Sequence, residues 1–218
     1  MVVVRAKRGL ARGAPGGVRE AGPSGTAEGA FVAVVGASGV GKDTLIASAR
    51  ERLGEDARFA FPHRWITRPP DATEQSEELT REEWERRRAA GLCALAWEAH
   101  GIAYGIPAGV DGELAAGRIV VANVSRAVLD EARRRFGRCE AIMIEAKAET
   151  LALRLTARGR EGAAARARRL ARPTRALPPG LPVHRIVNDG TLATAARLFH
   201  DTLLRIAGDR PAESVASR

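Results

Sequence analysis

Apolar residues recur along the chain in two patterns, short runs and helical spacings, which alternate over most of its length. Strands are predicted for the apolar runs at residues 31–35, 119–122 and 140–145 and for the mixed segment 184–188. Helices are predicted where apolar positions recur every three or four residues, at about 44–53, 126–136, 149–158 and 191–206. This alternation is typical of an α/β fold whose central parallel sheet is covered on both faces, a three-layer sandwich. Ligands of such folds bind at the carboxyl ends of the strands.

The stretch between residues 58 and 116 departs from this alternation of strands and helices. Residues 58–67 predict a further strand, which ends in the loop Thr67-Arg68-Pro69-Pro70. Residues 93–107 alternate like a strand, turn at Gly101 and return, which predicts a hairpin. We therefore expect a distinct region at about residues 68–116 inside the main domain.

Both ends of the chain lack periodicity. Residues 1–29 are mainly Gly, Ala, Arg and Pro, and the short apolar start is too brief for a signal-peptide core. We expect a disordered leader at residues 1–29, one domain at 30–207 and a flexible tail at 208–218. A basic nucleic-acid-binding arm is the alternative for the leader, and scattered charges disfavour it.

A glycine-rich loop separates the first predicted strand from the first predicted helix. Its sequence is Gly36-Ala-Ser-Gly-Val-Gly41-Lys42-Asp43-Thr44. Glycines let the backbone turn tightly and aim N–H groups at a phosphate chain, and Lys42 can reach the β- and γ-phosphates. The loop is thus a P-loop, with a plain strand-to-helix turn as the alternative. The residues expected to bind the nucleotide are Gly36, Ala37, Ser38, Gly39, Val40, Gly41, Lys42, Asp43 and Thr44.

Composition and charge narrow the class of protein. The 218 residues are 45% hydrophobic, and 35 Lys and Arg against 26 Asp and Glu give a net charge of +9, which suits an anionic partner such as a nucleotide or a sugar phosphate. Cys93 and Cys139 form no disulfide framework, which fits a reducing compartment. The longest uncharged apolar stretch, residues 29–41, is too short to span a bilayer. We expect a soluble cytoplasmic protein with no membrane partner and no specific nucleic-acid partner, and the sequence leaves the oligomeric state open.

An arginine-dense segment lies between the last two predicted strands. Residues 154–176 carry eight arginines, and small kinases have a helical lid at this point of the chain. A lid brings cations to the transferring phosphoryl group and excludes water. We expect Arg158 and Arg160 to be catalytic together with Lys42. Several of the other arginines must form a solvated basic face.

Four motifs resemble the guanylate kinase superfamily over residues 30 to about 207. They are the glycine-rich loop, Thr67-Arg68-Pro69, Trp97-Glu-Ala-His-Gly-Ile-Ala-Tyr104-Gly105 and Ala157-Arg-Gly-Arg160. Asp after the loop lysine, and Trp97-Glu-Ala-His-Gly with Tyr104-Gly-Ile-Pro107, are similar to the ribose 1,5-bisphosphate phosphokinase family of bacterial phosphonate breakdown. The resemblance implies a guanylate kinase-like P-loop fold with an arginine-rich lid. It implies transfer of phosphate from ATP to ribose 1,5-bisphosphate, which gives 5-phosphoribosyl 1-diphosphate and ADP.

The resemblance also implies roles for single residues. Arg68 and Tyr104 would bind a phosphate of the acceptor, with Arg126 as a further contact. Asn188, after the last strand, would lie by the adenine. A phosphate acceptor is already anionic at neutral pH because its second pKa is about 6, so no general base is needed.

Departures from the guanylate kinase pattern bear on the acceptor. Glu98 matches an acid that reads the guanine base, which keeps guanylate kinase, GMP to GDP, as the alternative function. Ile106 stands where guanylate kinases have Ser or Thr, and Asn123 where they have Asp. A site that hydrogen-bonds guanine loses discrimination without these partners. A non-catalytic binding module is a further alternative, which the intact Lys42 disfavours.

The loop departs from G-x-x-x-x-G-K-[ST] at its last position, where Asp43 replaces a hydroxyl residue that would hold Mg²⁺. A carboxylate oxygen is a hard ligand that suits Mg²⁺. Many P-loop enzymes carry a Mg²⁺-directing acid at the end of the middle strand, where this chain has Asn123. We hypothesise that the acid has moved from that strand to Asp43.

Overall fold

The computed structural model describes residues 29–71, 74–157 and 176–208, with side chains at 155–157 excepted. Its larger sheet has five strands in the order β2-β7-β1-β8-β9, and every pair is parallel. The strands are β1 (Ala30–Gly36), β2 (Phe59–Ala60), β7 (Ile119–Asn123), β8 (Cys139–Glu145) and β9 (Val183–Val187). The predicted α/β fold with a central parallel sheet is confirmed.

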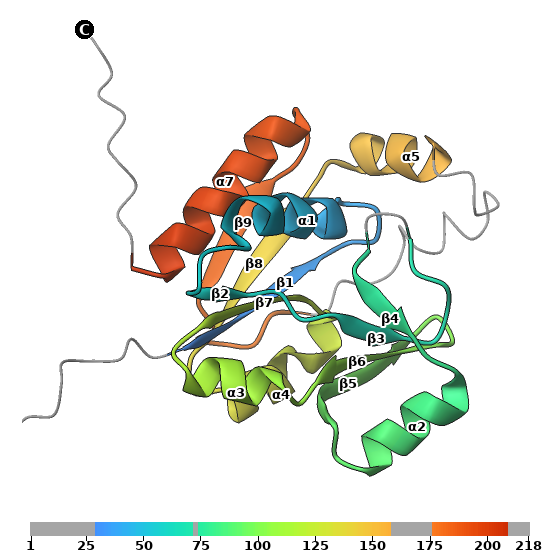
Figure 1. Ribbon diagram of the computed structural model, residues 1–218. Helices are drawn as coiled ribbons and strands as arrows, with labels where there is room; N and C mark the ends of the chain where they lie inside the picture. The colour runs from blue at the N-terminus through green and yellow to red at the C-terminus, as the bar shows by residue number, and fades with distance from the viewer. Residues whose placement is uncertain (1–28, 72–73, 158–175, 209–218) are drawn as a thin grey trace, which may run out of the picture.

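Helices cover both faces of this sheet (Figure 1). One face carries α1 (Lys42–Leu53) and α7 (Leu192–Ile206), and the other carries α3 (Val110–Ala115), the short 3₁₀ turn η1 (Arg126–Val128) and α4 (Leu129–Arg135). Successive residues of a strand point to opposite faces. Val32 of β1 therefore packs in the α1/α7 core, while Phe31 packs in the other core and stacks on Phe136 at 4.4 Å between ring centroids.

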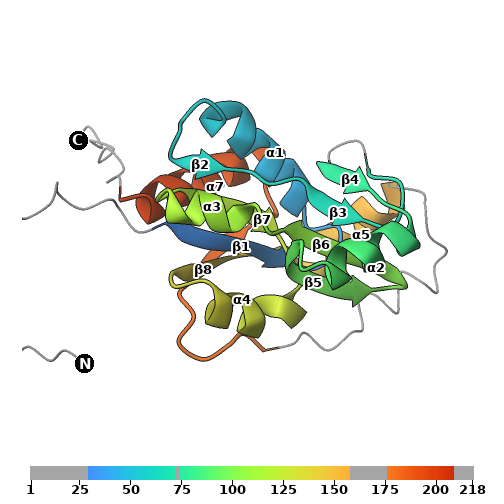
Figure 2. The ribbon, with the colours of Figure 1, turned by 60° about the horizontal axis from the view of Figure 1, so that its bottom comes forward.

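A second sheet lies beyond the carboxyl end of β1 (Figure 2). Its four strands run in the order β4-β3-β6-β5. They are β3 (Arg64–Ile66), β4 (Ser76–Glu78), β5 (Cys93–Ala99) and β6 (Ile102–Pro107), and α2 (Arg81–Ala89) packs on one face. The β5–β6 pair is the predicted hairpin, and its turn has positive φ at His100 (57°) and Gly101 (75°), as a two-residue turn requires.

The single strand predicted for residues 58–67 is wrong in one respect. The segment forms two short strands, and β2 belongs to the larger sheet while β3 belongs to the second. Pro62 lies between them and has no N–H to give to a sheet ladder. The chain therefore leaves one sheet and enters the other within four residues, which brings the second sheet to the site.

The remaining sequence predictions concern segments at the margins. Residues 1–28 of the expected leader, 158–175 of the expected lid and 209–218 of the expected tail lie outside the described residues. The helix α5 (Ala148–Ala157) ends within the first residues of the expected lid. Within the described ranges, no helix has the length and apolar character needed to cross a membrane.

Candidate active site

The glycine-rich loop joins β1 to α1 at the carboxyl edge of the larger sheet. Gly36 has φ of 152°, and a Cβ there would lie 2.4 Å from the Ile144 carbonyl oxygen. Gly41 has φ of 95°, and a Cβ there would lie 2.7 Å from Asn188 Nδ2. Only glycine fits both positions. The first N–H groups of α1 have no acceptor within the helix, so they are available at the loop for an anion.

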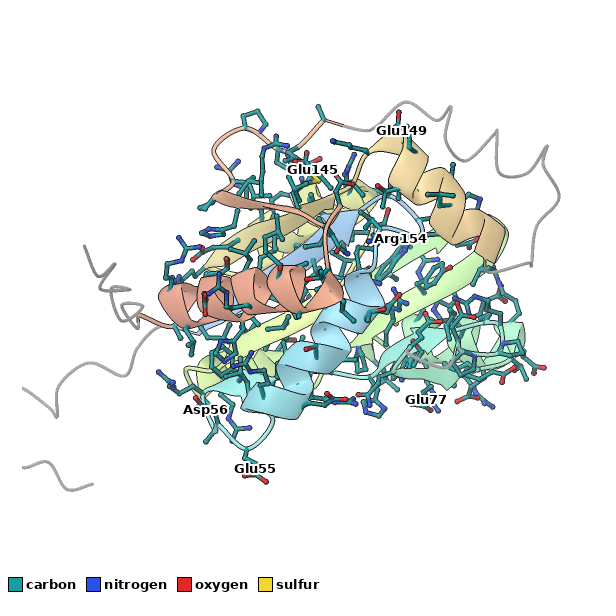
Figure 3. The ribbon with its side chains drawn as sticks, turned by 90° about the horizontal axis from the view of Figure 1, so that it is seen from above. Glu55, Asp56, Glu77, Glu145, Glu149 and Arg154 are labelled. Atoms are coloured by element: carbon teal, nitrogen blue, oxygen red, sulfur yellow. The ribbon has the colours of Figure 1, made fainter. Side chains whose placement is uncertain are left out.

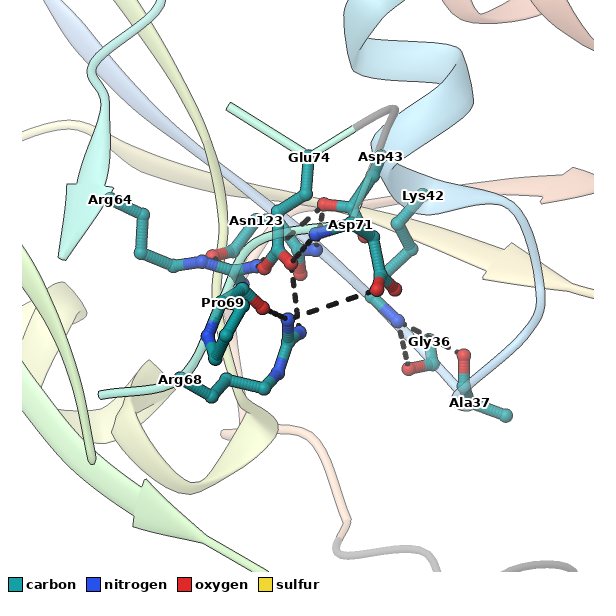
Figure 4. Close-up of polar contacts among 10 residues, drawn as sticks. All are labelled: Gly36, Ala37, Lys42, Asp43, Arg64, Arg68, Pro69, Asp71, Glu74 and Asn123. Atoms are coloured by element: carbon teal, nitrogen blue, oxygen red, sulfur yellow. Dashed lines mark hydrogen bonds and ion pairs between the residues drawn. The ribbon is translucent and has the colours of Figure 1, made fainter. Parts of the chain in front are cut away.

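Lys42 lies across this loop. Its Nζ donates to the Gly36 carbonyl oxygen at 2.9 Å and to the Ala37 carbonyl oxygen at 3.0 Å (Figure 4). These bonds hold the ammonium over the concave side of the loop. A phosphate chain bound by the loop would meet a positive charge already in position.

Two side chains hold the loop from the opposite side, through the Val40 carbonyl oxygen. Asn188 is buried, and its Nδ2 donates to this oxygen at 2.9 Å. Arg154 of α5 reaches the same oxygen at 3.5 Å, and Figure 3 shows it between α5 and the start of α1. Asn188 was expected beside the adenine, and the structure puts it against the loop backbone.

Asp189, the next residue, holds the start of α5. Its carboxylate accepts from the Lys147 N–H at 2.7 Å, and this bond, together with the Thr150 hydroxyl, lowers the pKa of Asp189. The short segment after β9 thus contacts both the glycine-rich loop and the helix that leads into the expected lid.

Asp43 and Asn123 lie 80 residues apart in the sequence and are in direct contact. Asn123 Nδ2 donates to Asp43 Oδ1 at 2.6 Å, and Arg64 Nη2 lies 3.8 Å from the same oxygen. The Asp43 side chain is 33% exposed, so its carboxylate can also reach a ligand from solvent. The end of β7 and the first turn of α1 therefore form one polar site.

A pocket opens beside this pair, between α1 and the segment that links the two sheets. Its polar lining residues are Asp43, Arg50, Arg64, Gln75 and Asn123. Ile46, Phe61 and Ile106 are among its apolar lining residues. The Asp43–Asn123 pair therefore lines a small pocket.

Two arginines and a buried glutamate form the neighbouring cluster (Figure 4). The Glu74 carboxylate lies between Arg64 and Arg68, with Oε1 bonded to Arg64 and Oε2 to Arg68 Nη2 at 2.8 Å. Arg64 Nη1 donates to the Asn123 carbonyl oxygen at 3.2 Å. Arg64 thus links the second sheet to the end of β7.

The charges of this cluster stabilise one another. Burial on its own would raise the pKa of Glu74, but Arg64, the Asp71 N–H and Arg68 together hold that pKa below its usual range. Burial on its own would lower the pKa of Arg68, and Glu74 reverses that effect and raises it. Glu74 and Arg68 are therefore both ionised at neutral pH.

Tyr104 of β6 lies against the same cluster. Its ring stacks on Trp97 at 5.3 Å between centroids, and the Arg64 guanidinium carbon lies 5.2 Å from the tyrosine ring centroid. Tyr104 also acts on the pKa of Arg68, so the two are close. The structure thus places Arg68, Tyr104, Asn123 and the glycine-rich loop, which the sequence analysis assigned to the site, around one cluster of contacts.

Glu98 is not brought to this group. It pairs with Ala103 in the β5–β6 register, whereas Trp97 pairs with Tyr104, so Glu98 points to the opposite face of the hairpin. There its Oε1 accepts from Arg81 Nη2 at 2.6 Å, and this bond lowers the pKa of Glu98. The side chain is 47% exposed beside α2. Alternation predicted the strand, but not which face would meet the site.

The remaining cationic residues that the sequence predicted for the site are Arg126, Arg158 and Arg160. Arg126 Nη2 contacts Met143 Sδ at 3.1 Å, and its Nε is buried with no hydrogen-bond partner among the described residues. Burial lowers the pKa of Arg126, although Glu145 partly offsets this. Arg158 and Arg160 lie outside the described residues.

Sequence reasoning missed Arg64 and Glu74. Arg64 is 9% exposed and Glu74 8%, and both are charged. Buried charges are rare unless paired, so burial marks them as a functional or structural pair. Nothing in the sequence signalled this, because Glu74 lies in a polar stretch without periodicity.

Comparisons with known proteins agree with this architecture. No protein-family model matches the chain. A ribose 1,5-bisphosphate phosphokinase of Pseudofrankia inefficax is 48% identical over 190 residues, which cover 87% of this chain and 96% of that protein. The protein of the same name from Acidiphilium cryptum is 47% identical over 177 residues, 81% of this chain and 93% of that protein.

Among solved structures, the guanylate kinase of Anaplasma phagocytophilum superposes with a TM-score of 0.53. It is 18% identical, and the match covers 87% of this chain and 92% of the other. At this identity the likeness concerns the fold alone, which is guanylate kinase-like. The sequence identities decide the family: this chain belongs to the ribose 1,5-bisphosphate phosphokinase family.

Proposed function

We propose that the protein transfers the γ-phosphoryl group of ATP to ribose 1,5-bisphosphate and releases 5-phosphoribosyl 1-diphosphate and ADP, as a step of phosphonate breakdown. Relatives with 41–48% identity over most of the chain carry that activity in their names. The observation that carries the choice of acceptor is the position of Glu98, which faces α2 and is bonded to Arg81. With Glu98 on that face, an acceptor without a base suits the site better than GMP.

The described residues fit a nucleotide. The loop leaves first-turn N–H groups for phosphates, and a side chain at position 41 would fill the space against Asn188. We assign the β- and γ-phosphates to the amides of residues 36–44 and to Lys42. Asn188 would act by holding the Val40 carbonyl and hence the loop.

The described residues also fit a divalent cation, and we assign it to Asp43. Mg²⁺ in kinases uses one or two carboxylates together with substrate phosphates. When bound, Mg²⁺ would neutralise charge on the β- and γ-phosphates. Asn123 would orient the Asp43 carboxylate through the 2.6 Å hydrogen bond.

Acceptor binding falls to the second sheet and its loop. Arg68 and Tyr104 would hold one phosphate of the sugar, and Arg126 stays a proposed further contact. An arginine fork suits a phosphate dianion through paired hydrogen bonds. This acceptor-binding region, predicted at about residues 68–116, would start at Arg64, because β3 already belongs to the second sheet.

The lid completes the proposed site. Arg158 and Arg160 would meet the transferring group after closure, and exclusion of water would limit ATP hydrolysis. We also infer a cytoplasmic enzyme of the domain 30–207, whose net charge of +9 serves its phosphate ligands rather than a specific nucleic acid.

The reaction is tested by ADP release with ATP and Mg²⁺, with ribose 1,5-bisphosphate and GMP in parallel wells. We expect turnover on the sugar bisphosphate at least about 100-fold above that on GMP. Lys42→Ala is the control for contaminating kinases. Preference for GMP would identify a divergent guanylate kinase, and silence with both acceptors would favour a non-catalytic binding module.

The metal assignment has its own test, Asp43→Ser, with turnover measured against Mg²⁺ concentration. We expect a higher Mg²⁺ requirement and a lower maximal rate, because the variant loses the carboxylate in the first turn of α1 that faces the end of β7. Asp43→Asn keeps the shape and the contact to Asn123 and separates charge from packing. Unchanged Mg²⁺ dependence and turnover in Asp43→Ser would contradict the assignment.

A further inference from the structure

We propose that Glu74 is a positioning residue that holds Arg64 and Arg68 as a pair, so that affinity for the acceptor depends on a buried carboxylate that the acceptor does not touch. The inference rests on the proposed function for the identity of the acceptor. It concerns a residue that neither the motifs nor the family resemblance singles out.

The two carboxylate oxygens of Glu74 are divided between the two arginines. Oε1 is bonded to Arg64, while Oε2 accepts from Arg68 Nη2 at 2.8 Å and from the Asp71 N–H at 3.2 Å. The Glu74 side chain is 2% exposed. Its direction is therefore fixed by contacts on both sides, and it fixes the distance between the two guanidinium groups.

Each arginine faces the site with the part of its guanidinium that Glu74 leaves open. Arg68 is 30% exposed, and its other described contacts are to the Pro69 carbonyl oxygen at 2.6 Å and to Asp71 at 3.9 Å. A guanidinium has five N–H donors, so it can bind a carboxylate on one edge and a phosphate on another. Glu74 thus orients the Arg68 guanidinium and leaves some of its N–H donors available for a phosphate.

Arg64 extends the cluster to the transfer site. Its side chain is 11% exposed, bonds the Asn123 carbonyl oxygen and lies 3.8 Å from Asp43 Oδ1. A buried cation without its partner is strongly destabilised, so Arg64 would move if Glu74 lost its charge. The position of both arginines relative to Asp43 then depends on one carboxylate.

Two other roles for Glu74 predict different changes in acceptor affinity. If its carboxylate merely occupied the place of an acceptor phosphate, removing the charge would tighten acceptor binding. If the residue only stabilised the fold, its loss would lower the melting temperature without separating acceptor from ATP. Positioning predicts weaker acceptor binding with ATP binding retained.

The experiment is calorimetry of ribose 1,5-bisphosphate added to full-length protein saturated with ADP and Mg²⁺. For Glu74→Gln we expect an acceptor Kd about tenfold or more above that of the unaltered protein, and an ADP Kd within about twofold. Glu74→Asp, which restores the charge one methylene short, should recover part of the loss. Steady-state kinetics should show the same pattern, with KM raised for the acceptor and nearly unchanged for ATP.

Glu85→Gln is the matched control, because it removes a glutamate from an exposed ion pair with Arg81 on α2. It should change neither Kd. An acceptor Kd that is unchanged or lower in Glu74→Gln, or an equal rise for ADP, would overturn the inference. Turnover of the unaltered protein tests the proposed function separately. If that protein binds GMP instead, GMP replaces ribose 1,5-bisphosphate in the calorimetry, and the acceptor Kd and the ADP Kd are compared in the same way.

Discussion

We propose phosphate binding for both the glycine-rich loop and the cluster around Glu74, and the two are built in different ways. The loop is nine consecutive residues that offer backbone N–H groups, and neighbours such as Asn188 fix it by a single carbonyl. The cluster takes side chains from β3, from the loop between β3 and β4, and from β6, and a buried charge holds them together. A site of the first kind fails when its backbone is distorted or its one cation is lost, whereas a site of the second kind also depends on a buried carboxylate that holds its cations in place.

The largest expected effect is the loss of the lysine charge in the loop. Lys42→Ala should lower kcat by about 100-fold or more, because the ammonium held over Gly36 and Ala37 is positioned for charge that develops in the transition state. ADP-release kinetics measure kcat, and thermal unfolding checks the fold. A loss below about tenfold would mean that the loop works through its backbone alone.

The second-largest expected effect tests whether nucleotide binding depends on the backbone conformation of the loop. Gly41→Ala should raise KM for ATP by about tenfold and destabilise the fold by about 2 kcal/mol, because φ is 95° and the added Cβ meets Asn188. Gly91→Ala is the matched control, with φ of 72° and no atom within 4 Å of the added Cβ. It shares the backbone strain, so an equal change in its KM would contradict the proposed contact.

The cluster should respond to pH where the loop does not. The pKa of Glu74 is lowered in the folded protein from the ordinary value of 4.5, so its ion pairs stabilise the fold above that value and are lost as pH falls through the folded pKa. The stability difference between the unaltered protein and Glu74→Gln, about 2 kcal/mol at neutral pH, should be constant above about pH 5 and narrow below 4.5. Chemical denaturation across this range measures it, and a difference that stays constant into acid would contradict the ionised pair.

The smallest effect is expected at Glu98. Glu98→Gln should change KM for either acceptor by less than about twofold, because its exposed carboxylate is bonded to Arg81 on the far face of the hairpin, and such pairs contribute little. The measurement is the same parallel assay with ribose 1,5-bisphosphate and GMP. A selective loss of GMP turnover would show that Glu98 reads a base after all.

Several features of this site could be predicted because they depend on residues that are adjacent in the sequence. The strand, the glycines and Lys42 follow one another, and local rules of backbone geometry determine what such a segment forms. The hypothesis that the acid has moved from the middle strand to Asp43 stays a prediction, and the structure adds a hydrogen bond of 2.6 Å from Asn123 Nδ2 to Asp43 Oδ1. The two residues meet because β1, which leads into the loop, and β7 are parallel neighbours that end at the same edge of the sheet.

Other features could not be predicted, for reasons that differ from residue to residue. Alternation assigned Glu98 to a strand, but the face is set by the register of β5 against β6, and a shift of one residue reverses it. Apolar residues on both sides of Pro62 led residues 58–67 to be predicted as one strand, and only the division between two sheets showed β2 and β3 as separate strands.

The sequence by itself determined the order of strands and helices, the phosphate-binding loop and the family, because each depends on local patterns or on identity with relatives. Only the tertiary structure decided which charges are buried and which face one another. Glu74 lies ten residues from Arg64 and six from Arg68, in a polar stretch that looks exposed. Its role arises because folding removes it from water, which makes its charge costly unless both arginines are present.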